Sequence, residues 1–373
     1  MKNYIGKDIP KLGFGLMRLP EKNGEIDIGQ TCQMADLFME RGFTYFDTAY
    51  GYNNGKSEEA AKIAVVDRYP RESFQLASKL PAWLAKTADE AKQMFWTSLK
   101  RSGVDYFDFF LLHNIGDKRT ASFDEFGIWD FLAEQKEKGL IKHLGFSIHD
   151  KASVLEETFI NHPDMEFAQL QINYADWDNL MNESGKCYEV AKKYDKPIII
   201  MEPIRGGNLS DPPPSVQALL READPEASFA SWALRFAASL DNVITVLSGM
   251  SDIEQMEDNL ATMEYFKPLD AGEQAIIEKA RDIISAIPEV PCTGCNYCLE
   301  GCPQGIAISL VMKAINRNLV YASFDLAKGN YQWATVNGAK GSECIACGRC
   351  EEICPQHISV MEELSKAAAL FEK

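Results

Sequence analysis

The feature that most constrains this 373-residue chain is a regular alternation of short apolar runs with amphipathic helical stretches. Helical patterns occupy the intervals, for example at 30–41, 88–101, 124–138 and 229–240. Eight runs rich in β-branched or aromatic residues are predicted as strands: 12–16, 44–49, 74–80, 107–113, 143–149, 167–173, 197–203 and 242–249. Several are almost wholly apolar, which is typical of parallel strands covered on both faces.

Eight strand–helix units within about 250 residues predict an α/β fold, a closed (β/α)8 TIM barrel. The alternative is an open doubly wound sheet. That alternative usually carries G-x-G-x-x-G after its first strand, and this chain has no such motif there. We therefore expect a barrel, in which the chemistry lies at the carboxyl ends of the strands.

The cysteines are concentrated at the other end of the chain, where eight of the ten lie between Cys292 and Cys354. They form two copies of one spacing, C-x2-C-x2-C-x3-C-P, which is the bacterial ferredoxin pattern. In two-cluster ferredoxins the fourth cysteine of each motif ligates the other cluster. Zinc is the alternative, although it usually takes two separated cysteine pairs. We expect two 4Fe–4S clusters, one held by Cys292, Cys295, Cys298 and Cys354, the other by Cys344, Cys347, Cys350 and Cys302.

Two prolines near 287–291 mark the boundary between these regions, because proline disfavours continued helix. We predict a barrel domain at 1–265, a helical linker at 266–290 and a ferredoxin-type domain at 291–373. Roughly forty residues separate the two cysteine motifs, and 308–316 reads as helix, so the C-terminal domain is expected to be mostly helical.

The charge balance excludes several classes of partner. There are 38 basic and 55 acidic residues, giving a net charge of −17, which repels nucleic-acid backbones and anionic membranes. No apolar run approaches the ~20 residues that span a bilayer, and the N-terminus lacks the apolar core of a signal peptide. These features predict a cytoplasmic protein that binds neither nucleic acid nor membrane.

Polar residues at the predicted strand ends suggest a shared site. Asp47, Lys79 and His113 end successive strands, and Tyr52 follows closely after Asp47. An ammonium beside a phenol favours the phenolate and so lowers the phenol pKa. The set therefore suits proton delivery to a carbonyl oxygen. From the residues alone, Tyr50 could replace Tyr52, and His113 could be a core histidine.

The segments at 46–52 (FDTAYGY), 77–80 (ASKL) and 110–113 (FLLH) resemble those of the aldo-keto reductases. The resemblance covers about residues 12–260. It implies a (β/α)8 barrel that binds a nicotinamide cofactor and reduces an aldehyde or ketone, or oxidises the alcohol. The family spacing selects Tyr52 over Tyr50. The implied catalytic residues are Asp47, Tyr52, Lys79 and His113.

The resemblance also implies a nicotinamide site, with two departures from the family pattern. The family usually has Asn after the serine of the segment at 145–147, and this chain has Ile148. The simpler interpretation is a weaker contact there, and the alternative is that His149 takes it over. Met201 replaces the aromatic residue that commonly stacks on the ring. Trp83 is expected in the substrate pocket, with Tyr50 and Trp129 as further candidates. The nicotinamide contacts implied are Ser147, Gln169, Met201, Ile204, Arg205 and Gly206.

The segment from 247 to 259 resembles the part that holds the adenosine phosphate, through Gly249, Gln255 and Asn259. Many NADPH-preferring members carry Lys and Arg where this chain has Gly249 and Gln255. Because a 2′-phosphate would lose charge-assisted bonds there, we expect a weak preference for NADPH over NADH. Arg205 is a candidate substitute cation.

The combination of barrel and cluster module resembles a subgroup of iron–sulfur aldo-keto reductases. It predicts an NAD(P)H-dependent oxidoreductase whose clusters relay or store electrons, with a small carbonyl compound as substrate and a ferredoxin-like carrier as a possible partner. Two alternatives remain open. One is a ferredoxin-dependent reductase that does not use nicotinamide, and the other is an electron-transfer protein whose barrel no longer turns over.

Overall fold

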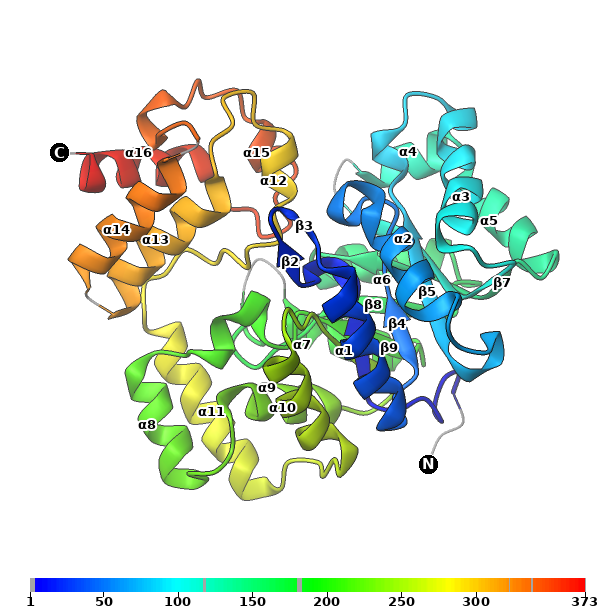
Figure 1. Ribbon diagram of the computed structural model, residues 1–373, viewed down its shortest axis with the longest axis horizontal. Coiled ribbons are helices and arrows are strands. Elements are labelled where there is room, and N and C mark those ends of the chain that lie inside the picture. Colours follow the sequence, from blue (N-terminus) through cyan, green and yellow to red (C-terminus); the bar gives the residue numbers. More distant parts are fainter. Residues whose placement is uncertain (1–3, 117–118, 180–182, 322, 337, 373) are drawn as a thin grey trace. The chain divides into compact units, whose positions relative to one another are not determined.

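The computed structural model describes residues 4–116, 119–179, 183–321, 323–336 and 338–372. Eight parallel strands close into a barrel in the order β1-β10-β9-β8-β7-β6-β5-β4, which confirms the predicted fold class (Figure 1). The strands are β1 Leu12–Gly15, β4 Tyr45–Asp47, β5 Gln75–Leu80, β6 Phe107–Ile115, β7 Ile141–Ile148, β8 Phe167–Gln171, β9 Ile198–Met201 and β10 Val243–Ser248. Each of these strands overlaps one of the eight strands predicted from the sequence. A separate hairpin pairs β2 Glu21–Lys22 with β3 Glu25–Ile26.

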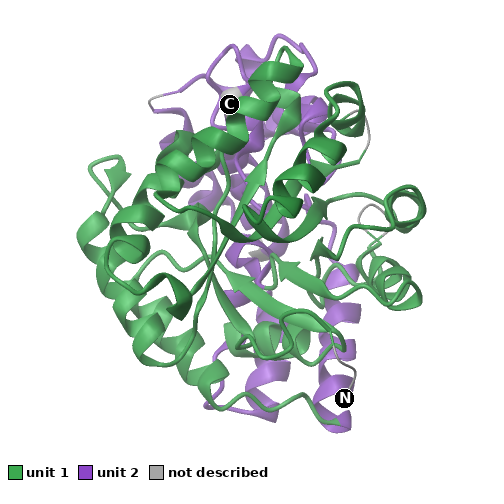
Figure 2. Cartoon of the chain, turned by 90° about the vertical axis from the view of Figure 1, so that its right-hand side faces the viewer, with its two compact units in different colours: residues 1–203, 230–270 green, residues 204–229, 271–373 purple. Residues whose placement is uncertain are grey.

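The chain divides into two compact units (Figure 2). The first holds residues 1–203 and 230–270, and its helices surround the barrel strands. Its α-helices are α1 Ile28–Glu40, α2 Lys56–Ala61, α3 Ala88–Ser102, α4 Arg119–Glu125, α5 Ile128–Glu137, α6 Ala152–Asn161, α7 Ser184–Lys193, α9 Phe229–Ala238 and α10 Ile253–Glu264. Short helical turns are η1 Leu16–Arg18, η2 Tyr52–Gly55, η3 Lys62–Val66, η4 Arg71–Ser73 and η5 Ala82–Leu84.

One predicted helix is divided in two. The sequence suggests a continuous helix at 124–138, but α4 ends at Glu125 and α5 starts at Ile128. Between them, Gly127 has a φ of +62°, a left-handed conformation that a helix cannot contain. The structure therefore corrects that boundary.

The barrel interior is filled by side chains from alternating strand positions, as expected of a packed barrel. One buried cluster includes Tyr45, Phe109, Phe167 and Ile244, which come from four different strands. This packed core leaves the carboxyl ends of the strands to carry polar side chains. The strand register sets how far along the barrel each of these side chains lies. Ser147 pairs with Gln169, and Gln171 pairs with Met201.

The second unit holds residues 204–229 and 271–373. Its elements are η6 Arg205–Ser210, α8 Pro214–Ala223, α11 Ala271–Ser285, α12 Tyr297–Glu300, α13 Ile308–Tyr321, α14 Phe324–Thr335, η7 Gly341–Glu343, α15 Arg349–Glu352 and α16 Val360–Phe371. The C-terminal region is mostly helical, as predicted. Its core joins residues of α13, α14 and α16 with Cys350 and Cys354. Among the described residues, no helix is both long and apolar enough to cross a membrane.

Candidate functional site

The four predicted catalytic residues come together at the carboxyl ends of β4, β5 and β6. The Lys79 side chain is fully buried, and its Nζ lies 2.5 Å from Asp47 Oδ1. The same Nζ donates to the carbonyl oxygen of Thr48 at 2.9 Å and to Tyr52 Oη at 3.4 Å. The Tyr52 and His113 rings meet edge to face, with their centroids 5.7 Å apart. One ammonium thus joins a buried carboxylate to a phenol beside an imidazole.

Short-range backbone contacts hold this arrangement. Tyr52 begins η2, and its backbone N–H donates to the carbonyl oxygen of Ala49. Tyr50 is placed differently, because its backbone N–H donates to Lys79 O and its ring packs against the guanidinium of Arg101. Of the two tyrosines weighed from the sequence, Tyr52 is the one whose hydroxyl contacts the Lys79 ammonium.

Burial dominates the electrostatics of the site. It lowers the pKa of Lys79 below its usual value, and the Asp47 carboxylate opposes that shift. It raises the pKa of Asp47, and Lys79 opposes that shift in turn. Burial also holds the pKa of His113 well below 6.5, and the nearby Lys79, His149 and Arg119 lower it further. His113 is therefore neutral at neutral pH.

Of the three pocket candidates, Trp83 contacts the site. Its ring, on η5, lies 5.5 Å from that of His113 between centroids, and 6.1 Å from Phe123. Trp129 is engaged elsewhere: it stacks on His162 with the centroids 3.6 Å apart, and its Nε1 donates to Asp124.

The predicted nicotinamide contacts of the first unit are Ser147, Gln169 and Met201, at the carboxyl ends of β7, β8 and β9. Ser147 and Gln169 are buried and register-paired. The Ser147 Oγ accepts from the backbone N–H of Asn114 at 2.7 Å, so its own hydrogen points elsewhere.

The predicted adenosine-phosphate contacts lie around the start of α10. Asn259 Nδ2 donates to Ser248 Oγ at 2.8 Å. The Gln255 side chain contacts the residues that cap the start of α10. Its Oε1 accepts from the backbone N–H of Ser251, and its Nε2 donates to Asp252 Oδ2. Gly249 lies against the Arg18 side chain, which a Cβ at Gly249 would meet at 3.4 Å. Arg18 is a basic residue that the sequence reasoning missed, because η1 is remote from this segment in sequence.

The remaining predicted cofactor residues, Ile204, Arg205 and Gly206, belong to the second unit. Arg205 is buried and forms an ion pair with Glu289. This carboxylate neutralises the guanidinium of Arg205, the candidate substitute cation for a cofactor phosphate. Gly206 and Gly207 adopt positive φ, which lets the chain turn sharply after Ile204.

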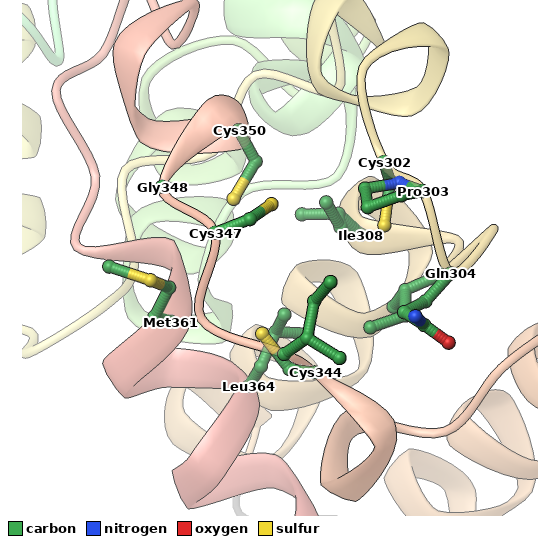
Figure 3. Close-up of a pocket in the computed structure, with 12 residues that line it drawn as sticks. Cys302, Pro303, Gln304, Ile308, Cys344, Cys347, Gly348, Cys350, Met361 and Leu364 are labelled. Carbon is green, nitrogen blue, oxygen red and sulfur yellow. The ribbon is translucent and has the colours of Figure 1, made fainter.

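The eight clustered cysteines lie in the second unit. Cys302 lines a pocket together with Cys344, Cys347 and Cys350 (Figure 3). The pKa of Cys298 is raised to about 12, chiefly by burial, and neighbouring Cys292, Cys354 and Cys350 add to the shift. Cys302, the fourth cysteine of its motif, therefore lies with the first three cysteines of the other motif. None of the ten cysteines, all in described residues, forms a disulfide.

The donor set fits an iron–sulfur cluster better than a single ion. Four thiols surround a cavity with apolar walls that include Ile306, Ile308 and Leu364. The spacing C-x2-C-x2-C-x3-C-P, rather than two separated cysteine pairs, favours such a cluster over zinc.

Comparison with known proteins agrees with this geometry. The family model described as the aldo/keto reductase family matches residues 11–282. The chain belongs to the aldo/keto reductase family. A second model, described as a 4Fe-4S dicluster domain, matches residues 291–359. This aldo/keto reductase thus carries a C-terminal iron–sulfur domain of the predicted kind.

Among its relatives, the uncharacterized oxidoreductase YqkF of Bacillus subtilis is 25% identical over 73% of this chain and 95% of YqkF. Aldo-keto reductase family 1 member C4 of Macaca fascicularis is 26% identical over 51% of this chain, which spans 61% of that relative.

Solved structures of the family share the fold. The holo form of an aldo-keto reductase from Bacillus halodurans superimposes with a TM-score of 0.61 at 24% identity, covering 75% of this chain and 95% of that one. An aldo-keto reductase from Klebsiella pneumoniae, solved in complex with NADPH, gives a TM-score of 0.58 at 20% identity, covering 73% and 90%.

Proposed function

We propose that this aldo/keto reductase interconverts a carbonyl compound and its alcohol with a nicotinamide cofactor, and that Tyr52 carries the proton. The observation that supports this most is the Lys79 Nζ, which contacts Asp47 at 2.5 Å and Tyr52 Oη at 3.4 Å. When bound, the cofactor supplies or accepts the hydride at the carbonyl carbon.

The chain's own residues handle the proton. Tyr52 Oη donates its hydrogen to the carbonyl oxygen as negative charge develops there. The Lys79 ammonium stabilises the resulting phenolate, because it stays within contact of Oη. Asp47 and the Thr48 carbonyl fix the ammonium in place. Neutral His113 donates a hydrogen bond that orients the same oxygen. In alcohol oxidation the phenolate removes the hydroxyl proton.

The cysteines would hold two 4Fe–4S clusters, with Cys302 serving the second motif and Cys354 the first. These clusters supply one-electron chemistry, and a ferredoxin-like carrier is the partner we propose for them. The four cysteines Cys302, Cys344, Cys347 and Cys350 line one pocket, which supports a cluster there. Because Cys347 is exposed, an external carrier could approach that cluster.

The test compares Tyr52→Phe with Tyr50→Phe in anaerobically prepared protein. We expect Tyr52→Phe to lower kcat for NAD(P)H-dependent reduction of a carbonyl panel by about a thousandfold, because the proton donor is removed. Tyr50→Phe is the matched control, and we expect it to retain kcat within about threefold. Full activity of Tyr52→Phe would contradict the proposal. Turnover with reduced ferredoxin, in the absence of NAD(P)H, would instead favour a ferredoxin-dependent reductase.

A further inference from the structure

The helical turn η6, which carries the predicted cofactor contacts Arg205 and Gly206, has a strained start. Arg205, Gly206 and Gly207 are consecutive residues with φ of +49°, +64° and +98°. Glycine tolerates this left-handed region, but at Arg205 it costs free energy, because Cβ crowds the following carbonyl oxygen. Such a conformation persists only where the surrounding structure holds it in place.

Residues 289–292, the segment that leads into the first cysteine motif, hold η6. The ion pair of Arg205 with Glu289 is largely buried, since the two side chains are 7% and 16% exposed. Asn208 Nδ2 donates to the carbonyl oxygen of Cys292 at 3.3 Å. One ion pair and one hydrogen bond thus join the two ends of this segment to η6.

The same segment is fixed to the core of the iron–sulfur domain. On α13, Asn316 Oδ1 accepts from the backbone N–H of Val290 at 2.8 Å, and Asn316 Nδ2 donates to the carbonyl oxygen of Val290 at 2.6 Å. The Val290 side chain is buried in the hydrophobic core that also contains Cys354. Cys292 packs against that core as well. The segment therefore contacts both η6 and the core that carries cluster cysteines.

A cluster held by Cys292 would restrain this segment at its end. Glu289 lies three residues before Cys292, and the backbone N–H of Cys292 donates to the carbonyl oxygen of Val290 at 2.7 Å. The chain between them is therefore short and turned. Because metal binding by a thiolate orders the backbone around it, ligation of Cys292 restrains the positions of Glu289 and of the carbonyl that Asn208 contacts.

We propose that ligation of the first cluster by Cys292 is coupled to nicotinamide binding at η6 through residues 289–292. With the cluster bound, the segment holds η6 in the strained conformation that receives the cofactor. With the cluster lost, η6 relaxes and the cofactor binds more weakly. Coupling between two sites is reciprocal, so the bound cofactor stabilises the first cluster. The proposal rests on the nicotinamide use proposed above and adds a regulation of that site.

The experiment measures the Kd of NADPH and of NADH by calorimetric titration of anaerobically prepared holoenzyme, which needs no turnover. Cys298→Ser removes an expected ligand of the first cluster from outside the 289–292 segment. We expect it to weaken the Kd about tenfold. Cys347→Ser removes a ligand of the other cluster, and its Kd should stay within about threefold of wild type. Iron content verifies the loss of a cluster in each variant, and circular dichroism verifies folding.

Glu289→Gln tests the link with both clusters in place. It takes the carboxylate away from the buried guanidinium of Arg205, which destabilises the held conformation of η6. We expect a Kd about tenfold weaker at unchanged iron content. Glu362→Gln is the matched control, because its carboxylate lies in the same unit and pairs with Lys366 at 2.9 Å on the surface of α16. Its Kd should stay within about twofold of wild type.

Reciprocity gives a second readout, measured in the Cys347→Ser background so that the iron of the first cluster is followed. Saturating NADPH should slow the loss of this iron to a chelator by about threefold or more. Adding Glu289→Gln should abolish that protection even at saturating NADPH. A merely structural defect would speed iron loss and still leave the protection in place, which would contradict the coupling.

The remaining outcomes separate the coupling from the function on which it rests. A Kd unchanged by both Cys298→Ser and Glu289→Gln would overturn the coupling and leave nicotinamide use standing. So would equal weakening in Cys298→Ser and Cys347→Ser. Tighter NADPH binding in Glu289→Gln would overturn it too, because Arg205 would then be a direct phosphate ligand. A wild-type protein that binds neither NADPH nor NADH would overturn the proposed function itself, and the coupling with it.

Discussion

At the residue scale, the site depends on which of two nearby tyrosines reaches an ammonium. Tyr50 and Tyr52 are two positions apart, and residue type alone does not distinguish them. Backbone bonds of Tyr50 to Lys79 and of Tyr52 to Ala49 turn the two side chains to different neighbours. The hydroxyl of Tyr52 meets Lys79 Nζ, and the ring of Tyr50 meets Arg101.

The buried His113 predicts a specific dependence of stability on pH. Its folded-state pKa lies well below the ordinary 6.5, so below pH 6.5 the unfolded chain binds a proton that the folded chain does not. Stability is therefore fully present above 6.5 and is lost as pH falls toward the folded-state pKa. The loss approaches about 1.4 kcal/mol per pH unit for one histidine.

The check is the unfolding free energy of wild type and His113→Gln at about pH 7 and about pH 5.5. Glutamine cannot be protonated, so we expect a smaller loss in the variant. Both proteins keep the same cysteines, and any acid effect on the cluster domain cancels in the difference. Equal losses in the two proteins would show that His113 titrates normally.

At the element scale, β7 and β8 approach each other closely at Gly145 and Phe167, two residues before Ser147 and Gln169 along each strand. Gly145 pairs with Phe167, and a Cβ at Gly145 would overlap the Phe167 carbonyl oxygen and lie 2.7 Å from its ring. A rigid backbone cannot yield as a flexible side chain can. Glycine at this position therefore sets the spacing of the two strands that carry the predicted nicotinamide contacts.

Gly145→Ala is thus expected to destabilise the protein by about 2 kcal/mol more than Gly139→Ala. Gly139 precedes the same strand with a φ of +79°, and a Cβ there would meet nothing within 4 Å. Its substitution costs only the strain of a left-handed backbone, about 1 kcal/mol. Chemical denaturation measures both variants, and equal costs would mean that the strands can separate freely.

A second element-scale prediction concerns η1 and the start of α10. Because Gly249 and Gln255 supply no charge, we expect less than about a hundredfold preference for NADPH over NADH in kcat/KM. Arg18 lies against Gly249 and is the nearby cation. We expect Arg18→Gln to lower kcat/KM about tenfold more with NADPH than with NADH. An equal effect on both cofactors would exclude a role in binding the 2′-phosphate.

At the scale of the whole molecule, we propose that the two cysteine motifs exchange their fourth ligands. Cys302 lines the pocket of Cys344, Cys347 and Cys350, although about forty residues separate it from them in sequence. Each proposed cluster would therefore link two distant parts of the second unit. Cys350 and Cys354 also belong to its hydrophobic core, so cluster binding and packing would support each other.

Crossed ligation makes a prediction that alkylation can check. In Cys302→Ser, anaerobic treatment with iodoacetamide should modify Cys344, Cys347 and Cys350, because their cluster has lost a ligand. Cys292, Cys295, Cys298 and Cys354 should stay protected, and iron content should fall by about half. Cys187→Ser is the control and should keep its full iron content. Modification of Cys292, Cys295 and Cys298 instead would mean that each motif holds its own cluster.

The sequence by itself determined the barrel and the cysteine spacing and proposed a catalytic set, because periodicity and motif spacing are local properties of the chain. Only the tertiary structure decided which side chains meet across elements. It paired Arg205 with Glu289, laid Arg18 against Gly249, and joined His149 to Asp176 through Gln171. Such contacts depend on strand register and on helix ends brought together by folding, and sequence spacing carries no direct record of them.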